Sequence, residues 1–232
     1  MQCGYNTTRG LWVVSVDMDT SMTSEELGGS ITFGLEVHDT LGYATSTGTK
    51  QEQPDANTAK FTRGMMARLS ANANIVVSQD VDTGTVQVPL RGSITALMRT
   101  HRELDDVNDP VVTMDGSTVV SLDVNLTTQV LDTTGTHLVP FTLSGSFDLS
   151  GASSNVLVPK PSEGSDTFCP TGGEMAVEMA IDLKVRMGSE HYTAKNNWQI
   201  DLGFQGDGTA NVSVQSGDYH ETTNSVVCSE VK

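Results

Sequence analysis

An acidic loop carries the densest set of metal-ligating side chains in the sequence. Residues 103–110 read Glu-Leu-Asp-Asp-Val-Asn-Asp-Pro. A hard cation such as Ca²⁺ prefers several carboxylate and amide oxygens at once. The sequence therefore favours an acidic turn that leads into a strand, and a weak Ca²⁺ site on the same irregular segment is the alternative. The predicted ligands are Asp105, Asp106, Asn108 and Asp109.

Within this loop, residues 106–110 (Asp-Val-Asn-Asp-Pro) resemble the calcium-binding linker motif of cadherins. The resemblance covers five residues and implies Ca²⁺ as their ligand. The glutamate-bearing partner motifs and the flanking repeats of cadherins are not evident in the rest of the chain.

Three cysteines offer a second kind of chemistry, at positions Cys3, Cys169 and Cys228. None forms a C-x-x-C pair, so zinc ribbons and thioredoxin-like redox sites have no local support. We expect Cys169 and Cys228 to form a disulfide that ties down the C-terminus, and three reduced thiols are the alternative. The bond would close a loop of about 60 residues and stabilise the fold by roughly 4 kcal/mol in the chain-entropy model.

The dipeptide Cys3-Gly4 resembles the lipidated start of a mature bacterial lipoprotein and implies a lipid anchor on Cys3. Met1 and Gln2 precede it, and no apolar signal segment is present. Either a signal peptide has been removed, or the chain starts at its natural methionine. A bond from Cys3 to a neighbouring subunit is a third interpretation.

The usual catalytic signatures are missing from the sequence. It contains no H-E-x-x-H, no G-x-S-x-G, no P-loop and no glycine-rich dinucleotide motif. The Asp pairs at positions 17/19 and 80/82 fit the outer face of strands. We therefore expect a protein that is not an enzyme and needs no cofactor, with a β-fold hydrolase using Asp pairs as an alternative.

Strict alternation of apolar and polar residues predicts the elements that must position these groups. From Met175 to Met187 every second residue is apolar, and the intervening positions are mostly charged or alanine. Such alternation is typical of antiparallel strands that bury one face. Residues 56–71 and 93–104 fit either a helix or a strand. Further strands are expected at 12–18, 31–37, 86–90, 120–127, 139–149, 192–204, 211–215 and 222–227.

Turn residues such as Asp115-Gly116 and Gly206-Asp-Gly208 indicate hairpins between neighbouring strands. We expect an all-β, antiparallel β-sandwich or barrel of roughly nine to ten strands with long loops. It forms a single domain over residues 1–232, and the loop at 150–173 is the one candidate sub-boundary.

Charge excludes several classes of partner. The chain has 232 residues and a formal net charge of −16, which repels nucleic-acid phosphates and anionic membranes. No apolar run approaches the roughly 18 residues of a transmembrane helix, so we expect no transmembrane segment.

These features together favour a non-enzymatic, extracytoplasmic envelope or surface protein of bacterial type, which acts by binding or as a structural element. Its partners would be other proteins or further copies of itself. The first alternative is a self-assembling subunit of a virion or filament, because long strands leave edges to pair.

Overall fold

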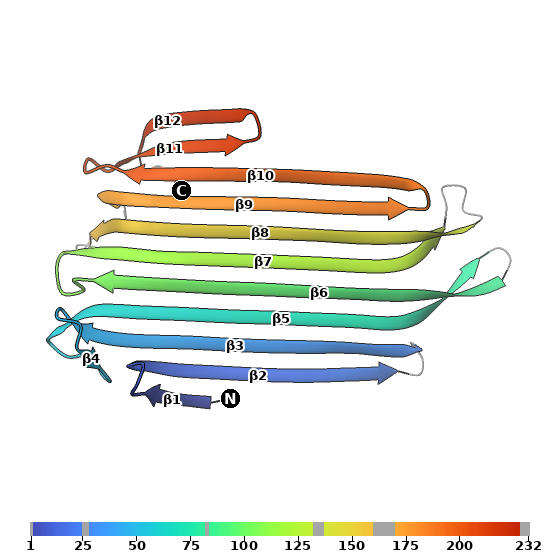
Figure 1. Cartoon of the computed structure of the whole chain (residues 1–232), viewed down its shortest axis with the longest axis horizontal. Helices are drawn as coiled ribbons and strands as arrows, with labels where there is room; N and C mark the ends of the chain where they lie inside the picture. Colours follow the sequence, from blue (N-terminus) through green and yellow to red (C-terminus); the bar gives the residue numbers. More distant parts are fainter. Residues whose placement is uncertain (1, 25–27, 82–83, 132–136, 160–169, 228–232) are drawn as a thin grey trace.

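Alternating side chains organise the chain into strands in the computed structural model (Figure 1). The structure describes all residues except 1, 25–27, 82–83, 132–136, 160–169 and 228–232. No helix occurs among the described residues. The strands are β1 (Gln2–Asn6), β2 (Leu11–Ser24), β3 (Gly29–Thr45), β4 (Lys50–Gln51), β5 (Thr58–Val81), β6 (Gly84–Asp105), β7 (Val111–Leu131), β8 (Leu138–Pro159), β9 (Gly172–Met187), β10 (Glu190–Phe204), β11 (Thr209–Ser216) and β12 (Tyr219–Val227).

All strands belong to one antiparallel sheet in which neighbours along the chain are neighbours in space. The order is β1-β2-β3-β5-β6-β7-β8-β9-β10-β11-β12, and the short β4 pairs with the end of β3. Figure 1 shows the strands side by side in a single layer, with β1 and β12 at opposite sides. The sheet does not close on itself.

The two faces of the sheet differ in chemistry because the register keeps apolar residues together from strand to strand. We define the apolar face as four cross-strand rows that each run through the eight strands β2, β3 and β5–β10. No position in these rows carries a charged side chain. The rows are Val16-Val37-Ala67-Met98-Val120-Leu149-Met179-Trp198, Met18-Leu35-Leu69-Ala96-Leu122-Phe147-Ile181-Asn196, Thr20-Phe33-Ala71-Ile94-Val124-Gly145-Leu183-Ala194 and Met22-Ile31-Ala73-Gly92-Leu126-Leu143-Val185-Tyr192.

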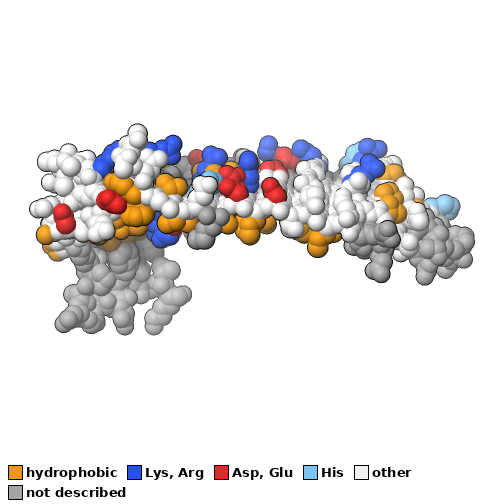
Figure 2. Space-filling model, turned by 90° about the horizontal axis from the view of Figure 1, so that it is seen from below, with side chains coloured by type: hydrophobic (Ala, Val, Ile, Leu, Met, Phe, Trp, Pro, Cys, Tyr) orange, Lys and Arg blue, Asp and Glu red, His pale blue; other side chains and the backbone are white. Residues whose placement is uncertain are grey.

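The opposite side, here called the polar face, carries the alternate residues of the same strands. Most of them are Ser, Thr, Asn, Asp, Lys or Arg. In Figure 2 most hydrophobic side chains gather along the lower side of the slab, and most charged side chains lie along the upper side.

Few side chains are buried, because one layer cannot enclose a core. Among the described residues the buried hydrophobic ones are near the sheet ends, and only Val156 is fully buried. They are Ile75, Val88, Val112, Val156 and Ala210.

The expected all-β antiparallel class is confirmed. A sandwich or barrel of nine to ten strands is not confirmed, since the described chain forms twelve strands in one open sheet.

The two ambiguous segments lie in β5 and β6 and are strands. The candidate boundary at 150–173 begins inside β8, and β8 pairs directly with β9, while residues 160–169 lie outside the described residues.

The start of β3 requires a residue without a side chain, which gives a test of the sheet register. A Cβ on Gly29 would lie 2.7 Å from the Cα of Ile75 and would also collide with the Asn74 carbonyl oxygen. We expect Gly29→Ala to lower the free energy of unfolding by about 1–3 kcal/mol, because strand backbone must move.

Gly203→Ala is the matched control, since nothing lies within 4 Å of its added Cβ. It should change stability by less than about 0.5 kcal/mol in urea unfolding at the same protein concentration. Equal stability of the two variants would contradict the pairing of β3 with β5.

Candidate functional site

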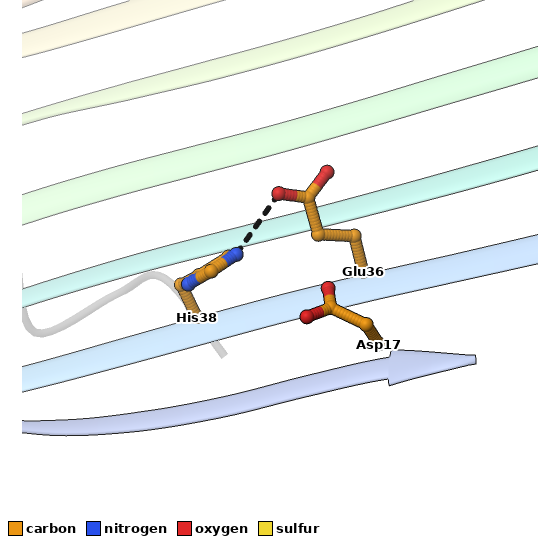
Figure 3. A group of neighbouring side chains, drawn as sticks. All are labelled: Asp17, Glu36 and His38. Atoms are coloured by element: carbon orange, nitrogen blue, oxygen red, sulfur yellow. Dashed lines mark hydrogen bonds and ion pairs between the residues drawn. The ribbon is translucent and has the colours of Figure 1, made fainter. Parts of the chain in front are cut away.

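Three metal-ligating side chains meet on the polar face at one side of the sheet (Figure 3). Glu36 and His38 are two residues apart on β3, so both point to the same face. Asp17 on β2 lies directly opposite Glu36 in the β2–β3 register. The hairpin that joins these two strands therefore assembles the cluster.

The geometry of this cluster suits a divalent cation that accepts nitrogen and oxygen ligands. His38 Nε2 lies 2.9 Å from Glu36 Oε1, and one ligand atom from each of the three residues lies within 4.8 Å of the others. The side chains of His38 and Glu36 are 36% and 37% exposed, so an ion would keep water ligands. One imidazole and two carboxylates form a donor set that Zn²⁺ accepts.

The charge balance around the cluster also favours a cation. Asp17 and Glu36 carry like charges on directly opposed positions, which destabilises a strand pair. Arg68 lies opposite Glu36 on β5. Together with Asp17 and Glu36 it lines a shallow depression on this part of the sheet. No ion pair within 4.0 Å links Arg68 to either carboxylate among the described residues. A bound cation would offset the repulsion that remains.

The same three residue types occur together a second time, with His and Glu in the reverse order along the strand and without the same geometry. His101 and Glu103 lie two residues apart on β6, and Asp115 lies opposite Glu103 on β7. Here Asp115 Oδ1 accepts a hydrogen bond of 2.7 Å from the backbone N–H of Asn155. Within the described chain these three residues do not form a cluster of converging ligand atoms. They provide a matched comparison for the Asp17–Glu36–His38 cluster.

The four predicted Ca²⁺ ligands lie at the end of β6 and in the turn that leads to β7. Asp105 forms a 2.9 Å ion pair with Lys60, whose pKa is raised by this hydrogen bond and charge. The Asn108 side-chain amide donates a 2.7 Å hydrogen bond to the Thr58 carbonyl. Asp106 adopts a left-handed backbone conformation with φ of 58°, and its carbonyl accepts from the N–H of Asp109. Two of the four predicted ligands thus have partners within the protein, and Ca²⁺ binding here stays a prediction.

Of the three cysteines, only Cys3 is among the residues that the structure describes. Cys3 lies on β1 as an exposed free thiol. Cys169 and Cys228, the predicted disulfide pair, lie outside the described residues. Lipidation of Cys3 stays a prediction.

The apolar face is the largest unexplained surface of the molecule. Its large side chains are exposed far beyond what a core position allows: 44% at Leu69, 43% at Ile94 and 36% at Leu122. The total accessible surface is 15049 Å². A compact monomer of 24.7 kDa has about 10,000 Å². The chain therefore exposes about half as much surface again as a protein of its mass that has a closed core.

Two long stretches of strand edge are also unpaired within the described chain. β1 pairs only with residues 11–15 of β2, and β11 pairs only with residues 199–204 of β10. Residues 16–24 of β2 and residues 190–198 of β10 therefore have a neighbouring strand on one side only. Such edges offer unsatisfied backbone N–H and C=O groups to another strand.

Comparison with protein-family models gave no match, and comparisons with curated proteins and with solved structures gave none either. The described residues contain no helix with the length and hydrophobicity to span a membrane. Function must therefore be inferred from the cluster, the apolar face and the strand edges.

The cluster generates a prediction with a built-in control. With Zn²⁺ at about a hundredfold excess over Kd, binding to the native state alone adds about 2.7 kcal/mol to the free energy of unfolding. We expect the resulting rise in melting temperature to be lost in Asp17→Asn and in His38→Gln. Differential scanning calorimetry at pH 7.5, with and without Zn²⁺, measures it.

The control is His101→Gln, which alters the second pattern and should keep the full Zn²⁺ effect. A wild-type protein that shows no Zn²⁺ effect would show that the cluster is only a polar surface group. Equal losses in His38→Gln and His101→Gln would point to scattered histidine binding.

Proposed function

We propose that the protein is a self-assembling structural subunit whose apolar face is covered by the same face of a second copy. The observation that carries this proposal is the set of four apolar rows, which run across eight strands without a charged residue and which no other described part of the chain covers. A sheet that is apolar on one face needs a second layer to bury it.

The size of the face supports a stable interface. At about 4.8 Å between strands and about 6.7 Å between alternate residues, the four rows span about 1,000 Å². A standard protein interface buries about 800 Å² on each partner. The flat area of the apolar face therefore already exceeds the surface that each partner buries in a standard interface. The added surface of the protruding side chains is not included in this value.

A second copy is the partner that the chemistry fits best. A two-fold interface brings the same patch together from both chains, so an uncharged face meets an uncharged face. The two polar faces then point to water and carry most of the negative charge. Two sheets packed about 10 Å apart would form a β-sandwich, so the sandwich expected from the sequence would arise between two chains.

A structural role is better supported than small-molecule binding or catalysis. Ligand sites are usually concave, whereas the apolar rows cover a broad sheet surface. One depression lies over β8, β9 and β10, and its lining contains no histidine or cysteine. It is lined by residues of both alternating sets, such as Asp148 and Glu178 beside Leu149 and Met179. An envelope, surface or virion location stays a proposal, and the structural role is compatible with each.

One substitution on each face of β6 tests the proposal. Ile94 lies at the centre of the apolar face, and Ser93 beside it lies on the polar face between Asn72 and Asn125. We expect Ile94→Lys to weaken self-association at least tenfold, or about 1.4 kcal/mol, because it places a charge in the covered surface. Sedimentation velocity over a dilution series measures the association.

Ser93→Lys is the matched control, because it changes the net charge equally on the other face. It should associate like the wild type. Equal effects of both substitutions would mean that charge alone controls association. A wild type that sediments as a folded 24.7 kDa monomer at all concentrations would contradict the proposal.

A further inference from the structure

We propose that the free edge of β2, residues 16–24, pairs antiparallel with the same segment of another copy, about a two-fold axis at Thr20. The inference rests on the proposed self-assembly and adds a second contact to it. Covering the apolar face joins two sheets in layers, whereas this contact joins two sheets side by side.

The backbone of this segment fits a strand partner. All its residues pair with β3 on one side, in a register without a bulge from Leu11↔Gly42 to Ser24↔Gly29. On the other side the described chain supplies a neighbour only as far as residue 15. Nine consecutive residues of regular strand thus offer alternate N–H and C=O groups outward, and an added strand satisfies them best.

The segment lacks a bulge and the lysines and prolines that often protect an edge, and its only charged residues are Asp17 and Asp19. Residues 16–24 contain no Lys, Arg or Pro. The other free edge differs, because residues 190–198 of β10 include Lys195. Near that edge, Tyr192 donates a 2.9 Å hydrogen bond to Glu190, which raises the pKa of Tyr192. The β2 edge is therefore the better template for pairing.

The exposure of two methionine side chains on β2 also favours this edge as the site of pairing. Met18 and Met22 are 55% and 57% exposed, more than any large aliphatic side chain in the middle of the apolar face. They lie at the end of two apolar rows, where no further strand of the described chain continues the row. A neighbouring strand would cover both side chains.

The segment is self-complementary in one simple register. An antiparallel two-fold axis at Thr20 places Met18 opposite Met22 of the second copy on the apolar face. On the polar face it places Asp19 opposite Ser21 of the second copy, and Asp17 opposite Thr23. No carboxylate lies directly opposite another carboxylate. Residues of the apolar face pair with residues of the apolar face, and residues of the polar face pair with residues of the polar face.

In the same register the described strand β1 does not overlap the paired segment of the second copy. Since β1 pairs with residues 11–15, the β1 of each copy falls beyond the end of the other copy's β2. Nothing among the described strands then lies between the two paired segments. The apolar rows of the two chains become continuous across the junction.

Cysteine trapping tests this register directly. In a background with Cys3, Cys169 and Cys228 changed to Ser, Thr20→Cys should form a disulfide-linked dimer on mild oxidation, because opposed Cβ atoms lie about 5 Å apart. Met18→Cys and Met22→Cys should not link alone but should link when mixed. Ala194→Cys, at the centre of the free β10 edge, is the matched control and should stay monomeric on non-reducing gels.

The outcomes separate this inference from the proposed function. Cross-linking of Thr20→Cys well above Ala194→Cys, together with linking only in the Met18/Met22 mixture, supports the edge contact. Cross-linking no greater than the control, in protein that still associates through the apolar face, overturns the edge contact and leaves the proposed function in place. Folded protein that is monomeric and not cross-linked overturns both.

Discussion

The rest of the structure depends on one constraint: an apolar sheet face is stable in water only when another layer covers it. Hydrogen bonds between strands act within the plane of the sheet, and every strand from β2 to β10 has them on at least one side. The burial of side chains must come from the perpendicular direction, where the described chain supplies no second layer. The four rows centred on residues such as Leu69, Ile94 and Leu122 thus form half of a core.

The polar face and the free edge follow from the same alternation. Each residue that leaves the apolar rows points to water, which concentrates charge on one side of the sheet (Figure 2). Asp17 belongs to the Asp17–Glu36–His38 cluster. It also lies in residues 16–24 of β2, which pair with β3 but have no described strand on their other side. A cation at the cluster would reduce the negative charge beside the proposed edge contact. Metal binding and edge pairing would then reinforce one another electrostatically.

Sequence reasoning identified the strands because their period of two is regular, as in β9, where apolar residues alternate from Met175 to Met187. It left residues 56–71 open because Phe61, Met65 and Leu69 are four apart, a spacing that fits both a helix turn and one strand face. Sequence reasoning could not predict whether the strands form one sheet or two packed sheets. Alternation shows that one face of a strand is apolar, but it does not show what covers that face. Sequence reasoning also missed the cluster, because Asp17 meets Glu36 only through the β2–β3 register. Strands expected at 12–18 and 31–37, joined as a hairpin, were the available signal.

The dependence of unfolding on protein concentration tests the central claim most directly. If the core forms between two copies, folding and association are one equilibrium, and the midpoint of urea unfolding must rise with concentration. For a two-state dimer each tenfold increase adds about 1.4 kcal/mol to the apparent free energy of unfolding at 25 °C. The account predicts this rise over a hundredfold range of concentration. A midpoint that stays constant over that range, with a folded mass of 24.7 kDa, would contradict it.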